Sequence, residues 1–64
     1  MRQELRMHSR YEICKSTIDD IIENDTIDLQ INGALDVSVQ TISVCRSKDN
    51  TEFEIIIIYN IRTL

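Results

Sequence analysis

Residues 53–61 read FEIIIIYNI, and this stretch decides the fold of the chain. Side chains on a β-strand alternate between its two faces, and here both faces are apolar in the middle of the segment. Ile55, Ile57 and Tyr59 fall on one face, while Ile56 and Ile58 fall on the other. The segment is therefore predicted to be a strand that is buried on both sides.

The second apolar face of this strand needs a cover. Leaving Ile56 and Ile58 exposed forgoes roughly 1.5–3 kcal/mol for each side chain relative to full burial. The predicted helix is too short to cover both faces of a sheet, so we expect a second copy of the chain or a partner protein to pack there. The sequence thus predicts a homodimer with Ile56 and Ile58 in its interface. One alternative stays open, in which the N-terminal segment folds over this face as a longer helix.

The N-terminal segment, residues 4–14, alternates between charged and apolar side chains. Leu5 and Met7 share one side and Arg6 and His8 share the other, which is the period of a half-buried strand. The amino acids of the segment also favour a helix, but a helical stripe would leave Leu5 facing water. We therefore expect a strand here.

A helix signal starts at Ser16. The segment from Ser16 to Asp19 resembles a capping box in which Asp replaces the usual Glu, and acidic residues in the first turn suit the helix dipole. Its apolar face would be formed by Ile18, Ile21 and Ile22. Asn24 and Asp25 are expected to end the helix after roughly two turns, and so short a helix is stable only when it is packed.

The remaining segments are predicted to be strands joined by turns. Residues 27–31 alternate between apolar and polar, and Asn32-Gly33 suits a type I′ hairpin because both positions tolerate positive φ. The apolar residues that follow change parity, which predicts a β-bulge near Gln40-Thr41. They are Leu35, Val37 and Val39 before the change, and Ile42 and Val44 after it. Residues 47–50 are predicted to form a polar turn.

These elements predict one domain of the α+β class, residues 1–64. The expected order is a strand, a helix and a three-stranded antiparallel meander, with one short helix packed on a four-stranded sheet. A chain of 64 residues buries only about 60% of the surface that its unfolded form exposes. Disulfides or a metal would support so small a core, but the cysteines are too few for a disulfide scaffold and His8, Cys14 and Cys45 lack metal-ligand spacing. Association with another chain is left as the support.

The sequence contains no motif for catalysis or for a cofactor. His8 and Cys14 would lie roughly 20 Å apart on an extended strand, and the adjacent Asp19 and Asp20 would point in different directions on a helix. We therefore expect a non-enzyme with no cofactor, with His8 at the surface. The longest apolar run, 55–59, is far shorter than the roughly 18 residues of a membrane helix, and no signal peptide is recognisable. A cytoplasmic protein with reduced cysteines is expected, and a Cys14–Cys45 bridge stays open.

Charge is distributed unevenly along the chain, whose net charge is −4. Residues 1–16 hold four basic and two acidic side chains, whereas residues 17–64 hold three basic and nine acidic ones. An acidic surface can speed the capture of a basic partner. The candidate partner-binding residues are Asp19, Asp20, Glu23, Asp25 and Asp28. Nucleic-acid binding is disfavoured by the sign of the net charge.

The C-terminal half, with DVSVQTISV (36–44) and EIIIIYNI (54–61), resembles small uncharacterised proteins of Gram-positive bacteria and their phages, some of them sporulation-associated. The resemblance carries no site residue. It implies a phage or mobile-element product that binds and inhibits a host factor, such as a defence or nucleic-acid enzyme, as a homodimer. Two alternatives stay open: a small DNA-binding regulator that uses the basic N-terminal segment, and an assembly component that adds a strand to a partner's sheet.

Overall fold

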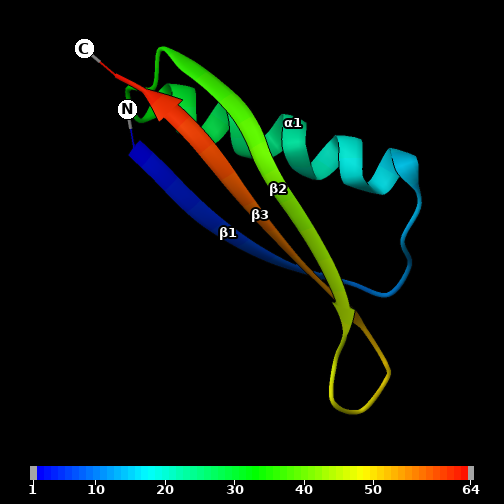
Figure 1. Cartoon of the computed structure of the whole chain (residues 1–64). Coiled ribbons are helices and arrows are strands. Elements are labelled where there is room, and N and C mark those ends of the chain that lie inside the picture. Colours follow the sequence, from blue (N-terminus) through cyan, green and yellow to red (C-terminus); the bar gives the residue numbers. More distant parts are fainter. Residues whose placement is uncertain (1, 64) are drawn as a thin grey trace.

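The computed structural model describes residues 2–63. Its elements are β1 (Arg2–Arg10), α1 (Lys15–Ile31), β2 (Asp36–Arg46) and β3 (Phe53–Arg62). The strands form one antiparallel sheet in the order β1-β3-β2, with α1 packed against one face (Figure 1). The α+β class is confirmed, and the last strand of the chain is the central strand of the sheet.

The sheet has three strands, so the predicted four-stranded sheet is wrong. Residues 27–31, predicted to be a strand, form the last part of α1, which is 17 residues long rather than about two turns. Ile21, Asp25 and Leu29 are its buried residues, and their spacing of four places them on one helical face. The alternation at 27–31 is misleading because only Leu29 among its apolar residues faces the core.

Asn32-Gly33 ends the helix instead of forming a hairpin. Gly33 has φ +105°, a conformation that costs glycine little. Its N–H donates to the carbonyl of Gln30, and the N–H of Ala34 donates to that of Leu29, both at 3.0 Å. These two bonds are those of the Schellman motif. The glycine is thus needed for positive φ, as predicted, but in a helix C-cap and not in a type I′ turn.

The start of α1 also differs from the prediction. Its N-cap residue is Cys14, whose side chain makes no capping bond to the backbone. Ser16 therefore lies inside the first turn, and the predicted capping box is wrong. The segment before it is a strand, as expected, although β1 spans Arg2–Arg10 and not residues 4–14. The alternative of a longer N-terminal helix is thereby excluded for residues 2–10.

The β2–β3 hairpin follows the sequence prediction closely. The register shifts between Val39 and Thr41, which confirms the predicted bulge at Gln40. In the connecting turn, Asp49 accepts hydrogen bonds from the hydroxyl of Ser47 at 2.7 Å and from that of Thr51 at 2.8 Å. These hydroxyls lower the pKa of Asp49 to about 2.

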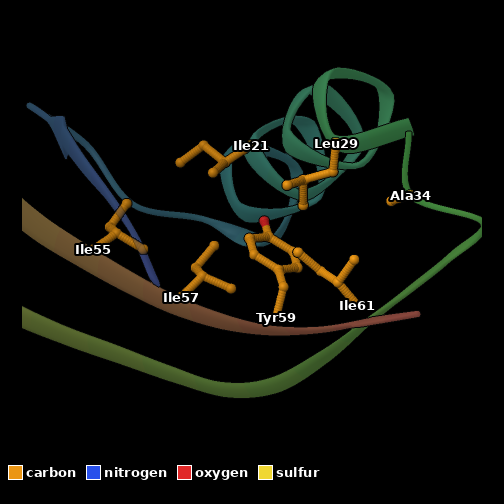
Figure 2. Packing of buried hydrophobic residues seen from close by; sticks show 7 residues of the cluster. All are labelled: Ile21, Leu29, Ala34, Ile55, Ile57, Tyr59 and Ile61. Atoms are coloured by element: carbon orange, nitrogen blue, oxygen red, sulfur yellow. The ribbon is translucent and has the colours of Figure 1, made fainter. Parts of the chain in front are cut away.

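The hydrophobic core lies between α1 and one face of β3 (Figure 2). Ile55, Ile57, Tyr59 and Ile61 are at most 1% exposed, and they pack against the remaining members of the cluster. Those are Ile21 and Leu29 of α1 and Ala34, just after it. One face of the central strand is therefore fully covered by the chain itself.

Helical and extended conformations of residues 27–31 predict opposite mutational patterns. Leu29 is 2% exposed and Ile27 is 48% exposed, whereas a strand would place them on the same face. Leu29→Asp buries a charge without a partner and should abolish cooperative unfolding or lower stability by more than about 3 kcal/mol. Ile27→Asp should change the free energy of unfolding by less than about 1 kcal/mol. Urea unfolding followed by circular dichroism makes the comparison, and equal losses would contradict the helix.

Candidate functional site

The face of the sheet opposite α1 carries an apolar patch. Residues paired across an antiparallel ladder project to the same side, and Leu5 pairs with Ile58 while Met7 pairs with Ile56. We call these four side chains the open-face patch. Leu5 is 55% exposed and Met7 is 63% exposed, and Ile56 and Ile58 are partly exposed. No element among residues 2–63 covers the patch, and it includes both residues of the predicted dimer interface.

Uncharged polar side chains surround most of this patch. At one end the Gln3 amide donates to the side-chain oxygens of Gln40 and Asn60, and this spans all three strands. β2 adds Ser38, Thr41 and Ser43 through its pairing with β3. The charged residues stand at the ends of the face: Glu54 at one, and the Asp36–Arg62 ion pair at the other. An apolar centre with a neutral polar border is the composition of a protein–protein interface.

On the opposite face of the sheet a buried carboxylate links three elements. Asp25 of α1 is 4% exposed. Its Oδ2 accepts a hydrogen bond of 2.6 Å from the Tyr59 hydroxyl of β3 and lies 2.8 Å from Nε2 of His8 in β1. Burial, followed by the bond to Asp25, raises the pKa of Tyr59. The His8 side chain is only 19% exposed, so the expectation of a surface histidine is wrong.

A second polar contact extends this link toward the end of β1. The Arg6 guanidinium lies 2.5 Å from a carboxylate oxygen of Glu4 and 2.8 Å from one of Asp28 in α1. Its hydrogen bonds to these two carboxylates raise the pKa of Arg6. The charged side of β1 therefore faces the helix. Its apolar side, with Leu5 and Met7, faces away from the helix.

The predicted acidic partner surface is divided by these contacts. Asp25 is buried, and Asp28 is paired with Arg6. Asp19, Asp20 and Glu23 remain exposed on α1, with the Asp19 carboxylate 3.9 Å from the Lys15 ammonium. The exposed acidic group is therefore smaller than the sequence suggested. One feature of the sequence indicates that Asp25 is buried: its spacing places it on the same helical face as the apolar Ile21 and Leu29.

Both cysteines are free and exposed, and they form no bridge in the structure. Cys14 Sγ lies 3.1 Å from the Ser16 hydroxyl and 3.2 Å from the Thr17 hydroxyl. These contacts lower the pKa of Cys14 to about 7. A substantial fraction of this thiol is thus the nucleophilic thiolate at neutral pH.

Residues 2–63 hold no group of three or more His, Cys, Asp or Glu side chains that could bind a metal ion, and no pocket. They also contain no helix with the length and apolar character required to cross a bilayer. The open-face patch is a surface feature that the contacts among residues 2–63 leave unexplained.

No protein-family model, curated protein or solved structure matches this chain. The resemblance to small proteins of Gram-positive bacteria and phages therefore stays a prediction.

The raised pKa of Tyr59 predicts a loss of stability in alkali. The ordinary pKa of tyrosine is 10.0, so above about pH 10 the unfolded chain loses the phenolic proton first. The stability that protonated Tyr59 contributes is complete below about pH 10. It declines as the pH rises toward the pKa of Tyr59 in the folded chain. Tyr59→Phe should remove this part of the decline, whereas Tyr11→Phe, at a residue that is 76% exposed, should retain it. Urea unfolding at pH 8 and pH 11 tests this, and equal declines in the two variants would contradict it.

The lowered pKa of Cys14 predicts fast alkylation at neutral pH. In a Cys45→Ser background, the rate of reaction with iodoacetamide should follow a titration with its midpoint near pH 7. Replacing Ser16 and Thr17 by Ala removes the hydroxyls and should shift the midpoint upward toward the ordinary value of 9.0. Mass spectrometry measures the rates. A midpoint that does not differ between the two proteins would show that the hydroxyls do not lower the pKa of Cys14.

Proposed function

We propose that this chain is a non-catalytic protein-binding module that associates with a second copy of itself through the open-face patch. The observation that carries the proposal is the exposure of Leu5 and Met7 beside Ile56 and Ile58 on a face that α1 does not cover. Burial of such side chains is the main driving force of association.

The area of the molecule supports association. The chain exposes 4563 Å², whereas a folded monomer of its mass typically exposes about 4,200 Å². Three strands of nine to eleven residues make a face of roughly 30 by 15 Å. Two such faces stacked together cover about 900 Å², which is in the range of small, transient interfaces below about 1,200 Å². The open face therefore has the area of a weak dimer contact.

The chemistry of the face favours a second copy over a charged ligand. Between Glu54 and the Asp36–Arg62 pair, the exposed groups are apolar or neutral polar. Two identical faces of this kind can meet without burying like charges in the centre of the contact. The Gln3, Gln40 and Asn60 amides can donate and accept toward the same groups of the other copy.

The exposed acids of α1 give the proposed module a second surface. Asp19, Asp20 and Glu23 face solvent and lie on the layer opposite the open face, so self-association leaves them free for a basic partner. Inhibition of a host factor is one form that such binding could take, and it stays a prediction. DNA binding is less well supported, because its basic segment is a strand and Arg6 is engaged by Glu4 and Asp28.

Charges introduced on the open face should abolish self-association through that face. The variant Leu5→Glu, Met7→Glu changes two side chains that the monomer already exposes, so folding should be retained. The matched control Ile27→Glu, Ile31→Glu removes two exposed apolar residues of α1, 48% and 78% exposed, from a different surface. Sedimentation equilibrium should show wild type and control at two or more times the chain mass of 7.5 kDa. The open-face variant should sediment at a lower average mass than wild type and control.

The interface residues themselves are tested by milder changes. Ile56→Thr with Ile58→Thr keeps the β-branched shape that strands favour and should weaken self-association at least tenfold while the circular dichroism spectrum is unchanged. A wild-type chain that sediments as a monomer at about 100 μM would overturn the proposal.

A further inference from the structure

The two free edges of the sheet differ in chemistry. β1 carries charged or titratable side chains at alternate positions, a pattern that protects an edge from pairing with another strand. They are Arg2, Glu4, Arg6, His8 and Arg10. β2 has no charged residue from Val37 to Cys45, and all of its residues except Val37 are exposed. The edge of β2 therefore presents its outer backbone groups without that protection.

An apolar row accompanies this edge on the helix side of the sheet. Val37 and Val39 pair with Ile61 and Tyr59, and Ile42 and Val44 pair with Ile57 and Ile55, so all four belong to the face that α1 covers. Nevertheless, Val39 is 37%, Ile42 is 41% and Val44 is 45% exposed. The helix leaves the row uncovered along the outer strand.

The bulge makes this row complementary to itself. In a regular strand Val39 and Ile42 would lie on opposite faces, because their separation is odd. The register shift at Gln40 places them on the same face. Two antiparallel copies of β2 can then pair Val39 with Ile42 of the second copy, and Val37 with its Val44, in both halves of the contact. The two bulges would meet at a two-fold axis between Gln40 and Thr41.

Charge favours the same arrangement. The uncharged stretch is bounded by Asp36 at one end and by Arg46 at the other, where the Arg46 guanidinium lies 4.5 Å from the centre of the Phe53 ring. Antiparallel pairing with the bulges opposed places Asp36 opposite the second copy's Cys45, one position from its Arg46, so the acidic end of each strand meets the basic end of the other, although the two side chains project from opposite faces. Parallel pairing would bring like charges together at each end.

We infer that the free edge of β2 is a pairing site for β2 of a second copy, which joins two three-stranded sheets into one of six strands. This contact uses other residues than the open-face patch, so it goes beyond the proposed function and does not depend on it. A chain that makes both two-fold contacts would assemble beyond a dimer.

Disulfide trapping tests the register directly. In the proposed pairing, residue 36 lies opposite the second copy's Cys45 on the open face, within the roughly 4.5–5.5 Å between Cα atoms that a disulfide spans. Within one chain, residues 36 and 45 of this strand are about 30 Å apart, so no internal bridge can form. Asp36→Cys in a Cys14→Ser background should therefore give a disulfide-linked dimer under mild oxidation.

The matched control is Val37→Cys in the same background, which moves the thiol by one residue to the opposite face. It should form at least tenfold less covalent dimer. A second variant tests whether the result at position 36 depends on the loss of Asp36. Ser38→Cys with Ser43→Cys places thiols opposite each other at two inner positions of the proposed pairing. Its background is Cys14→Ser, Cys45→Ser. Non-reducing electrophoresis and mass spectrometry of the bridged peptides give the readout.

Efficient bridging of both designed variants, with little in the control, supports the inference. The same bridging should persist when Leu5→Glu and Met7→Glu are added, so a failure of the open-face proposal would be distinguishable from a failure of this one. Equal bridging at positions 36 and 37 would indicate random collision and overturn it. Absence of covalent dimer in all variants at about 100 μM would also overturn it, and an unrelated extended peptide would then be the better candidate for this edge.

Discussion

β3 is apolar on both faces, and the described residues provide only one helix to cover them. α1 packs on Ile55, Ile57 and Tyr59, which are completely buried, and leaves Ile56 and Ile58 on the other face. Residues 2–63 contain no further element with which to build a second layer. Their remaining length is used in the two outer strands, which widen the uncovered face. The distribution of apolar residues over the central strand thus determines which face of the sheet stays uncovered.

The buried carboxylate of Asp25 determines which side of β1 joins that face. Because β1 alternates, its charged and apolar sides cannot both face the helix. The bond from His8 to Asp25 and the bond from Arg6 to Asp28 hold the charged side of β1 against α1. Leu5 and Met7 are consequently turned outward, next to Ile58 and Ile56. A polar contact inside the molecule therefore creates the apolar patch outside it, and removing one partner of such a buried contact leaves the other unsatisfied.

Local patterns were sufficient to predict β1, β3 and the bulge, because each depends on strict alternation within a few residues. The same rule failed at residues 27–31, where Ile27, Leu29 and Ile31 alternate but only Leu29 is buried. The helical spacing from Ile21 to Leu29 competes with that alternation, and the contact of Asp25 with Tyr59 and His8 decides in favour of the helix. This contact joins residues 17 and 34 positions apart in the sequence. Periodicity within a short window cannot reveal it. For the same reason the open face was predicted at Ile56 and Ile58 but not at Leu5 and Met7.

The bulge at Gln40 connects these features. By inserting one residue it keeps Val37 and Val39 on the helix side while bringing Ile42 and Val44 to that side as well, and it leaves the Gln40 side chain to bond with Gln3 across the open face. A strand without the bulge would turn Ile42 and Val44 to the open face and expose Thr41 and Ser43 to the helix layer. The apolar residues of the outer strand would then enlarge the open-face patch and remove its neutral polar border. One extra residue in the edge strand thus separates two apolar surfaces, one on each side of the sheet, and gives each of them its own boundary.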